Sequence, residues 1–309
     1  MRILDFFILL VLLVTLGLGL VFLWYNIPNA PGHLVKYQEF NINKTESIYR
    51  NGTQFYPNMR YKDRIISYSI SDSCDVTKKK DVQRAFSFIS EKTIVDFRLS
   101  NSGEIKVLCS DINPKPEERG HFVAGEGGPS EIINTTNYAI ILSGKVSLYR
   151  RTSECTRPNV AIHEILHALG FDHNNNPKSI MYPITECDQI LDNYIINEIN
   201  KLYKADSLPD LTIEKLKATK TGRYLSFEIT IGNFGLDDSL DSNLIIYAKD
   251  VEIKKFPLEN IDIGTRKILN VENLRTPLNT DLFVFEVNSN LEDLDKENNR
   301  VEINLVKME

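Results

Sequence analysis

Residues 163–173 read His-Glu-Ile-Leu-His-Ala-Leu-Gly-Phe-Asp-His, and the rest of the chain is best understood around them. On a helix, His163 and His167 are four residues apart, so both imidazoles leave the same face and can reach one metal ion. Gly170 stands where the helix must end, because a residue without a Cβ takes the left-handed conformation that reverses the chain. The reversal can bring His173 to the same ion as a third ligand.

Three neutral imidazoles leave one position of a tetrahedral zinc ion open for water, which is what a catalytic site needs. Glu164 is adjacent and can hold that water. The alternative is a buried helix with incidental histidines. It fits poorly, because three of the five histidines of the chain lie within these eleven residues and ionisable groups crowded on an apolar helix are costly without a metal.

The segment Ser179-Ile180-Met181-Tyr182-Pro183 follows the histidines closely. Over residues 160–183 the sequence resembles the metzincin metalloproteases, and most of all the matrixin (peptidase M10-type) branch, whose signature joins HExxHxxGxxH to a downstream Met-turn. The resemblance implies that His163, His167 and His173 bind zinc and that Glu164 is the general base. It also implies that Met181 forms the apolar floor beneath the histidines.

The pattern over residues 61–205 is mixed α/β and fits such a catalytic domain, with a twisted mixed sheet and three helices. Alternation predicts strands over 64–70, 94–99, 105–109, 138–142 and 146–149. Thr77 can cap a helix before the second strand. Pro158 stands near the start of the zinc helix, and Thr185 with Asp188 predicts the start of a last helix. Its apolar stripe is Ile190, Tyr194, Ile195, Ile199 and Leu202.

A glycine-rich segment, residues 120–129, lies between two predicted strands. Matrixins have a glycine-rich stretch near here that helps to bind structural calcium and a second zinc. Because the segment holds one histidine, His121, we expect no structural zinc. Calcium stays an unsupported alternative, and the favoured interpretation is a flexible loop on the rim of the cleft. His33 has no assigned role.

The N-terminal residues 1–25 are interpreted as an uncleaved transmembrane signal anchor, since residues 6–25 form an uncharged run long enough to span a bilayer. A cleaved signal peptide is the alternative, but Asn29-Ala30-Pro31 is a poor cleavage site. Residues 26–60 are polar and read as a stalk, with room for one short strand against the catalytic domain.

Four cysteines are present, Cys74, Cys109, Cys155 and Cys187, without a CxxC pair. Three connectivities are open, and we favour Cys74–Cys109 and Cys155–Cys187. The second bond would join the segment before the zinc helix to the segment after the Met-turn. Reduced, buried cysteines are the alternative.

Residues 206–309 change character, with short alternating strands separated by turn signals, which favours an all-β, Ig-like sandwich. The opening Pro209-Asp210-Leu211, the turn around Asn233 and Gly235, and residues 293–299 resemble CARDB domains, Ig-like modules of extracellular prokaryotic proteins. Such a domain could bind protein or surface ligands. The acidic residues at 293–299 lack the glycine and bidentate glutamate of an EF-hand loop, so a polar hairpin is favoured over a calcium loop.

The sequence therefore predicts a membrane-anchored, extracytoplasmic zinc metalloendopeptidase of α+β fold with a C-terminal sandwich. Glu164 would take the proton of a zinc-activated water, and a protein or peptide substrate would lie beside an edge strand within residues 122–142. The net charge of −6 and the lack of a basic stripe argue against nucleic-acid binding. Two alternatives stay open, a surface adhesin or binding protein with an inactive protease-like domain, and a zinc hydrolase of non-peptide amides. A secreted protein is the alternative localisation.

Overall fold

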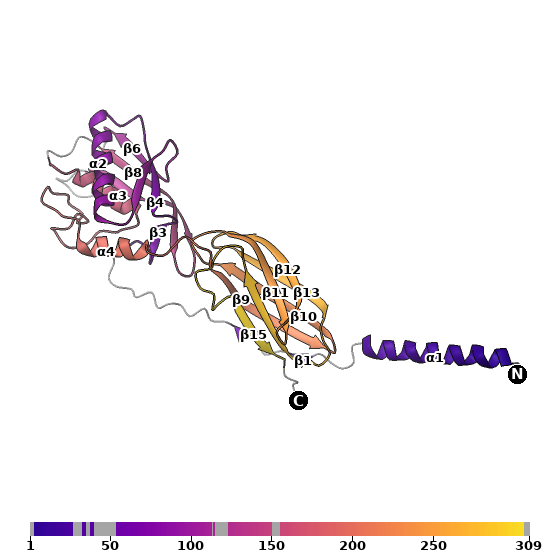
Figure 1. Ribbon diagram of the computed structural model, residues 1–309. Helices are drawn as coiled ribbons and strands as arrows, with labels where there is room; N and C mark the ends of the chain where they lie inside the picture. The colour runs from indigo at the N-terminus through magenta and orange to yellow at the C-terminus, as the bar shows by residue number, and fades with distance from the viewer. Residues whose placement is uncertain are drawn as a thin grey trace.

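The computed structural model describes residues 3–26, 33–34, 38–39, 54–112, 114, 123–149 and 155–305, and in the first helix it describes the side chains of residues 10–22. It consists of a mixed α/β unit followed by an all-β unit, which lie end to end (Figure 1).

A six-stranded sheet forms the centre of the first unit. Its parallel strands are β3 (Met59–Tyr61), β4 (Ile65–Ile70), β5 (Asp96–Leu99), β6 (Ile105–Ser110) and β8 (Ala139–Tyr149), in the order β3-β8-β6-β4-β5. Strand β7 (Gly125–Asn134) runs antiparallel to β8 along its other side, and β8 is its one strand partner in the described residues. Strand β7 is therefore an edge strand.

Two expectations about this sheet were wrong. The segments 138–142 and 146–149 belong to one strand, β8, because Gly144 between them stays paired and its N–H donates to the carbonyl of Glu104 at 2.9 Å. Much of the glycine-rich segment is strand β7 and not a loop, since pairing with β8 from Gly125 onward outweighs the low strand propensity of glycine. His121 and Phe122 lie outside the described residues.

In the part of this unit that the structure describes, the sheet is accompanied by helices α2 (Val76–Lys92), α3 (Asn159–Ala168) and α4 (Asn193–Leu202). The N-cap of α2 is Asp75, whose carboxylate accepts the N–H of Lys78 at 2.8 Å, and not Thr77. Helix α4 begins after Asp192, later than Thr185 and Asp188 predict, because Ser179 forms a bridge with Ile190 and holds that segment in turns.

The core of the first unit lies between the sheet and these helices. The stripe predicted for α4 is buried at Ile195, Ile199 and Leu202, whereas Ile190 and Tyr194 are exposed. The unit begins before residue 61, since Gln54 bridges to Phe171 and β3 lies within the sheet.

The second unit is a β-sandwich. One sheet holds β9 (Leu211–Thr221), β10 (Tyr224–Asn233) and β13 (Arg266–Arg275), and the other holds β11 (Ser239–Ala248), β12 (Val251–Ile261), β14 (Leu282–Asn288) and β15 (Arg300–Asn304). Alternate side chains of both sheets form one core. The short strands β1 (His33–Leu34) and β2 (Gln38–Glu39) pair with β9. Of the described residues in the segment 26–60, β1 and β2 thus pair with the sandwich, whereas Gln54 and the start of β3 pair with the first unit, as expected for a short strand against the catalytic domain.

The two units meet at the turn that joins β7 to β8. Ile140 of β8 packs with Leu236 and Ile263 of the sandwich, and Ile140 and Leu236 are fully buried. In the same turn, the side-chain amide of Asn137 donates to the carboxylate of Asp210 at 3.1 Å. The sandwich therefore holds the far end of the edge strand.

The N-terminal helix α1 covers Ile3–Asn26 and contains the predicted anchor. Among the described residues, no helix is long and apolar enough to cross a membrane. Membrane anchoring remains a prediction.

Candidate metal centre

Helix α3 and the turn after it carry the histidines. Pro158 precedes the first helical residue, where its missing N–H is harmless, and all ten residues of α3 are buried. At the other end, Gly170 has φ +93°, and its N–H donates to the carbonyl of His167 at 2.9 Å. The chain reverses there and returns beside the helix, which places His173 next to His167.

The three imidazoles converge on one point. The Nε2 atom of His163 lies 3.0 Å from that of His167 and 3.2 Å from that of His173, and the third separation is 3.1 Å. Tetrahedral zinc with Zn–N bonds of about 2.0–2.1 Å requires nitrogen separations of roughly 3.3 Å. The three side chains therefore fit one zinc ion.

Hydrogen bonds fix which ring nitrogens face the centre. The Nδ1–H of His163 donates to the carbonyl of Ile180 at 2.6 Å, and the Nδ1–H of His167 donates to the carbonyl of Phe171 at 2.7 Å. Because Nδ1 carries the proton in each neutral ring, both Nε2 atoms present lone pairs to one another. Such an approach is unfavourable without a cation between the nitrogens.

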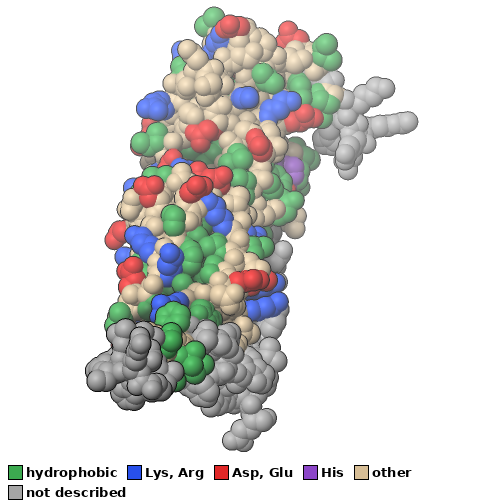
Figure 2. All heavy atoms as spheres, turned by 90° about the vertical axis from the view of Figure 1, so that its right-hand side faces the viewer, with side chains coloured by type: hydrophobic (Ala, Val, Ile, Leu, Met, Phe, Trp, Pro, Cys, Tyr) green, Lys and Arg blue, Asp and Glu red, His purple; other side chains and the backbone are tan. Residues whose placement is uncertain are grey.

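The protonation state of the histidines agrees with a metal site. Burial, and then the neighbouring His167, lowers the pKa of His163 to about 3. Burial lowers the pKa of His167 to about 4, and partial burial lowers that of His173, the most exposed of the three. All three rings are neutral at pH 7, the form that binds zinc. A histidine reaches the surface beside hydrophobic side chains in Figure 2.

Glu164 is buried next to the histidines. Burial, and then the charge of Glu126 on β7, raises its pKa to about 8. A nearby dication would favour the ionised form and lower this pKa. A bound metal would therefore favour the carboxylate, which is the form that can accept a proton.

The predicted Met-turn is hydrogen-bonded to the segments that carry the first and third histidines. Met181 is fully buried, and its N–H donates to the hydroxyl of Ser179 at 3.1 Å. The carbonyl of Met181 accepts the N–H of Asn174 at 2.9 Å, next to His173. The turn thus holds the segment of the third histidine, and its Ile180 carbonyl orients the first.

Several supporting groups were missed from the sequence. Besides the carbonyls of Phe171 and Ile180, the ring of Phe55 stacks on His167 with centroids 5.8 Å apart. Backbone carbonyls leave no signal in a sequence, and Phe55 lies in the segment assigned to the stalk. Within the described residues, the one group of three close His, Cys, Asp or Glu ligands is the histidine trio.

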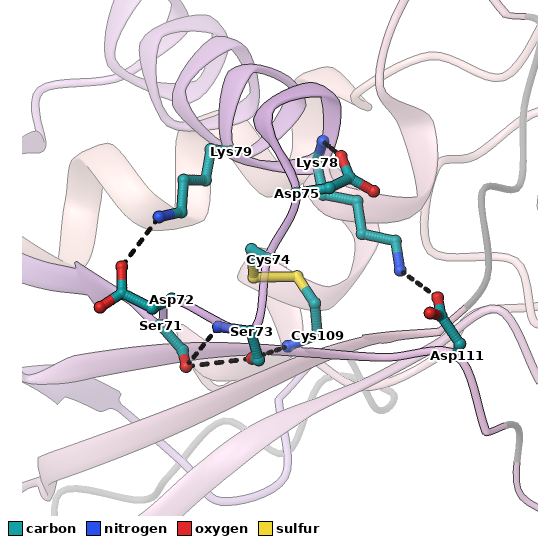
Figure 3. The surroundings of a disulfide bond; sticks show 9 residues. All are labelled: Ser71, Asp72, Ser73, Cys74, Asp75, Lys78, Lys79, Cys109 and Asp111. Carbon is teal, nitrogen blue, oxygen red and sulfur yellow. Dashed lines mark hydrogen bonds and ion pairs between the residues drawn. A yellow bond between two sulfur atoms is a disulfide. The ribbon is translucent and has the colours of Figure 1, made fainter.

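Both disulfides favoured from the sequence are present in the structure. Cys74 pairs with Cys109 where α2 begins beside β6, as Figure 3 shows. Cys155 pairs with Cys187 and joins the chain before α3 to the chain after Met181. The second bond closes a loop that contains all three histidines.

Comparison with known proteins shows that the first unit is similar to the matrixins. The family model of the matrixins matches residues 59–204. Macrophage metalloelastase from Oryctolagus cuniculus is 29% identical over 133 residues, which is 40% of this chain and 28% of that protein. The enzyme of the same name from Rattus norvegicus is 31% identical over 141 residues, with the same shares. The chain thus spans less than a third of the length of these relatives.

Among solved structures, a CARDB domain from Pyrococcus furiosus was found in two forms. Its crystal structure in complex with di-metal ions has a TM-score of 0.27 at 17% identity, and covers 33% of this chain and 90% of that one. Its solution NMR structure has the same TM-score and identity, with shares of 32% and 94%.

Proposed function

We propose that this protein is a zinc metalloendopeptidase that hydrolyses peptide bonds with Glu164 as general base, because the matrixin family model matches residues 59–204. The observation that carries the proposal is the convergence of three Nε2 atoms within 3.2 Å of one another beside a buried carboxyl. The intact Glu164 favours an enzyme over a binding protein with an inactive domain.

In this proposal His163, His167 and His173 hold the zinc ion. When bound, the zinc supplies a Lewis acid that acidifies a water molecule and polarises the scissile carbonyl. The carbonyls of Ile180 and Phe171 keep two of the rings in the tautomer that leaves Nε2 free. Met181 closes the site from below with an apolar side chain.

Glu164 moves the proton. Its carboxylate accepts a proton from the attacking water and passes it to the nitrogen of the leaving amine. Burial raises the pKa of the carboxyl, which makes the carboxylate a stronger base.

The substrate would lie extended along the free edge of β7, antiparallel to it and held by backbone hydrogen bonds. This strand is the edge strand closest to the site, because Gly125 and Gly127 lie against Glu164. Proteins and peptides are therefore the proposed substrates.

The proposal also places the body outside the cytoplasm, anchored by residues 1–25 through a stalk of residues 26–60. Two disulfides support an oxidising compartment. Apart from Thr15, the side chains described in α1 are apolar, and they are exposed, among them Leu10, Leu16 and Phe22. Residues 206–309 form the attached CARDB-like domain in this proposal.

Digestion of a peptide library at neutral pH tests the function. We expect cleavage by the wild type, inactivation by a chelator and recovery with zinc. Glu164→Ala should keep its zinc and lose turnover by about 10²-fold or more, since a general base contributes about 10²–10⁴-fold. An uncut library with zinc bound would favour a binding protein, and cleavage that ignores chelators would refute the metal mechanism.

A further inference from the structure

Strand β7 touches helix α3 at the catalytic carboxyl, and two glycines make the contact. A Cβ added at Gly127 would lie 2.1 Å from the backbone oxygen of Glu164 and 2.9 Å from its Cα. A Cβ added at Gly125 would lie 2.6–2.9 Å from the Cγ, Oε1 and Cδ atoms of Glu164. Contacts below 3.0 Å are essentially never seen for real Cβ atoms, so a side chain at either position would separate the strand from the helix.

The lack of space for a side chain, and not the backbone conformation, explains why glycine occupies positions 125 and 127. Among the described glycines, Gly170, Gly222 and Gly264 have positive φ, whereas Gly125 and Gly127 do not. An alanine could therefore adopt the backbone conformation of β7 at both positions. An alanine at either position would, however, increase the distance between β7 and α3.

The pleat of the strand assigns the two faces. Gly125 and Gly127 are two residues apart and both face α3, whereas Glu126 between them points to the other face. There its carboxylate accepts the hydroxyl of Tyr149 at 2.6 Å. A Cβ added at Gly128 would meet no atom within 4 Å. The residues of this stretch that lie against Glu164 are thus alternate ones, Gly125 and Gly127.

We propose that Gly125 and Gly127 are positioning residues, which set the distance between the substrate-binding edge of β7 and the catalytic Glu164. This inference rests on the proposed function. A substrate strand paired with β7 lies at the fixed inter-strand spacing of about 4.8 Å, so its peptide moves when β7 moves. A methyl group at residue 127 needs about 1 Å of extra room, and a misplacement of that size can cost about 10²-fold in rate.

The strand would move and the helix would stay. All ten residues of α3 are buried, and two of its histidines are tied to carbonyls of other segments. Strand β7 has one strand partner among the described residues and is free along its outer edge. The displacement therefore changes the alignment of substrate with Glu164 and leaves the three zinc ligands in place.

The test compares Gly127→Ala and Gly125→Ala with Gly128→Ala in the full chain. The last variant is the matched control, because it adds the same methyl group to the same strand without the contact. For each variant and the wild type, the experiment measures kcat and KM on one peptide and the zinc content. It also measures hydrogen exchange of residues 125–134 in the metal-free protein.

We expect kcat of Gly127→Ala to fall about 10- to 100-fold below that of Gly128→Ala, with similar KM, full zinc content and faster exchange confined to β7. Gly125→Ala meets the movable carboxylate end and should lose less. Equal kcat and equal exchange in Gly127→Ala and Gly128→Ala would overturn the inference, and so would loss of zinc or folding in both contact variants. If the wild type cuts no peptide, the proposed function fails, and the exchange data still decide whether the glycines hold β7 in place.

Discussion

Replacing Glu164 by Gln should stabilise the metal-free protein while it removes the proposed general base. Burial raises the pKa of this carboxyl from 4.5 to about 8, so the folded state binds its proton more tightly than the unfolded state. The stability that the carboxyl contributes is present below pH 4.5 and is lost as pH rises from 4.5 through about 8. At pH 7 the loss is about 3 kcal/mol, from about 1.4 kcal/mol for each pH unit above the unfolded-state pKa.

Urea unfolding of the wild type and of Glu164→Gln at pH 5, 6, 7 and 8, with a chelator present, measures the difference in their free energies of unfolding. We expect Glu164→Gln to be more stable by about 3 kcal/mol at pH 7, with a gap that narrows toward pH 5. The histidines titrate in both chains, so the difference isolates the carboxyl. Glu131→Gln is the control, because it removes an exposed carboxyl from strand β7, which packs against helix α3. A difference in unfolding free energy between the wild type and Glu164→Gln that does not change with pH would refute the reasoning.

Three further predictions follow from single contacts. Gly170→Ala should cost about 2–4 kcal/mol in urea unfolding and weaken zinc binding, since it combines a positive φ with a Cβ only 2.5 Å from Met59. Replacing Cys155 and Cys187 by Ser should cost about 3–4 kcal/mol, which is the loop-closure term for their separation of 32 residues, as thermal or urea unfolding would measure. Burial raises the pKa of Asp293 to about 6, so the contribution of this carboxyl to the stability of the fold falls as pH rises from 4 to 6. Between pH 4 and pH 7, the free energy of unfolding of Asp293→Asn should therefore increase by about 1–2 kcal/mol relative to the wild type, after allowance for solvent screening.

The histidine cluster could be predicted because its causes are local. Helical spacing brings His163 and His167 to one face, and a glycine that adopts positive φ turns the chain so that His173 can follow. Alternation likewise located β4, β5, β6 and β8 of the first sheet, although it divided β8 into two segments.

Features that depend on distant partners escaped prediction. Strand β7 is rich in glycine and reads as a loop until β8 pairs with it. The start of α4 shifted because Ser179 and Ile190 pair across a turn that no local rule anticipates. Glu126 affects the pKa of Glu164 only because the fold brings β7 against α3.

The contact between the β7–β8 turn and the sandwich has a practical consequence for anyone who shortens this protein. A fragment that stops at residue 205 would uncover Ile140, which is now fully buried, and would remove the partner of Asn137. The exposed Ile140 side chain would favour self-association of the fragment. The turn between β7 and β8 would also be less well held, and it lies at the far end of the strand proposed to bind substrate. The C-terminal sandwich therefore supports the end of β7 in the first unit, and recombinant protein for activity assays should retain it.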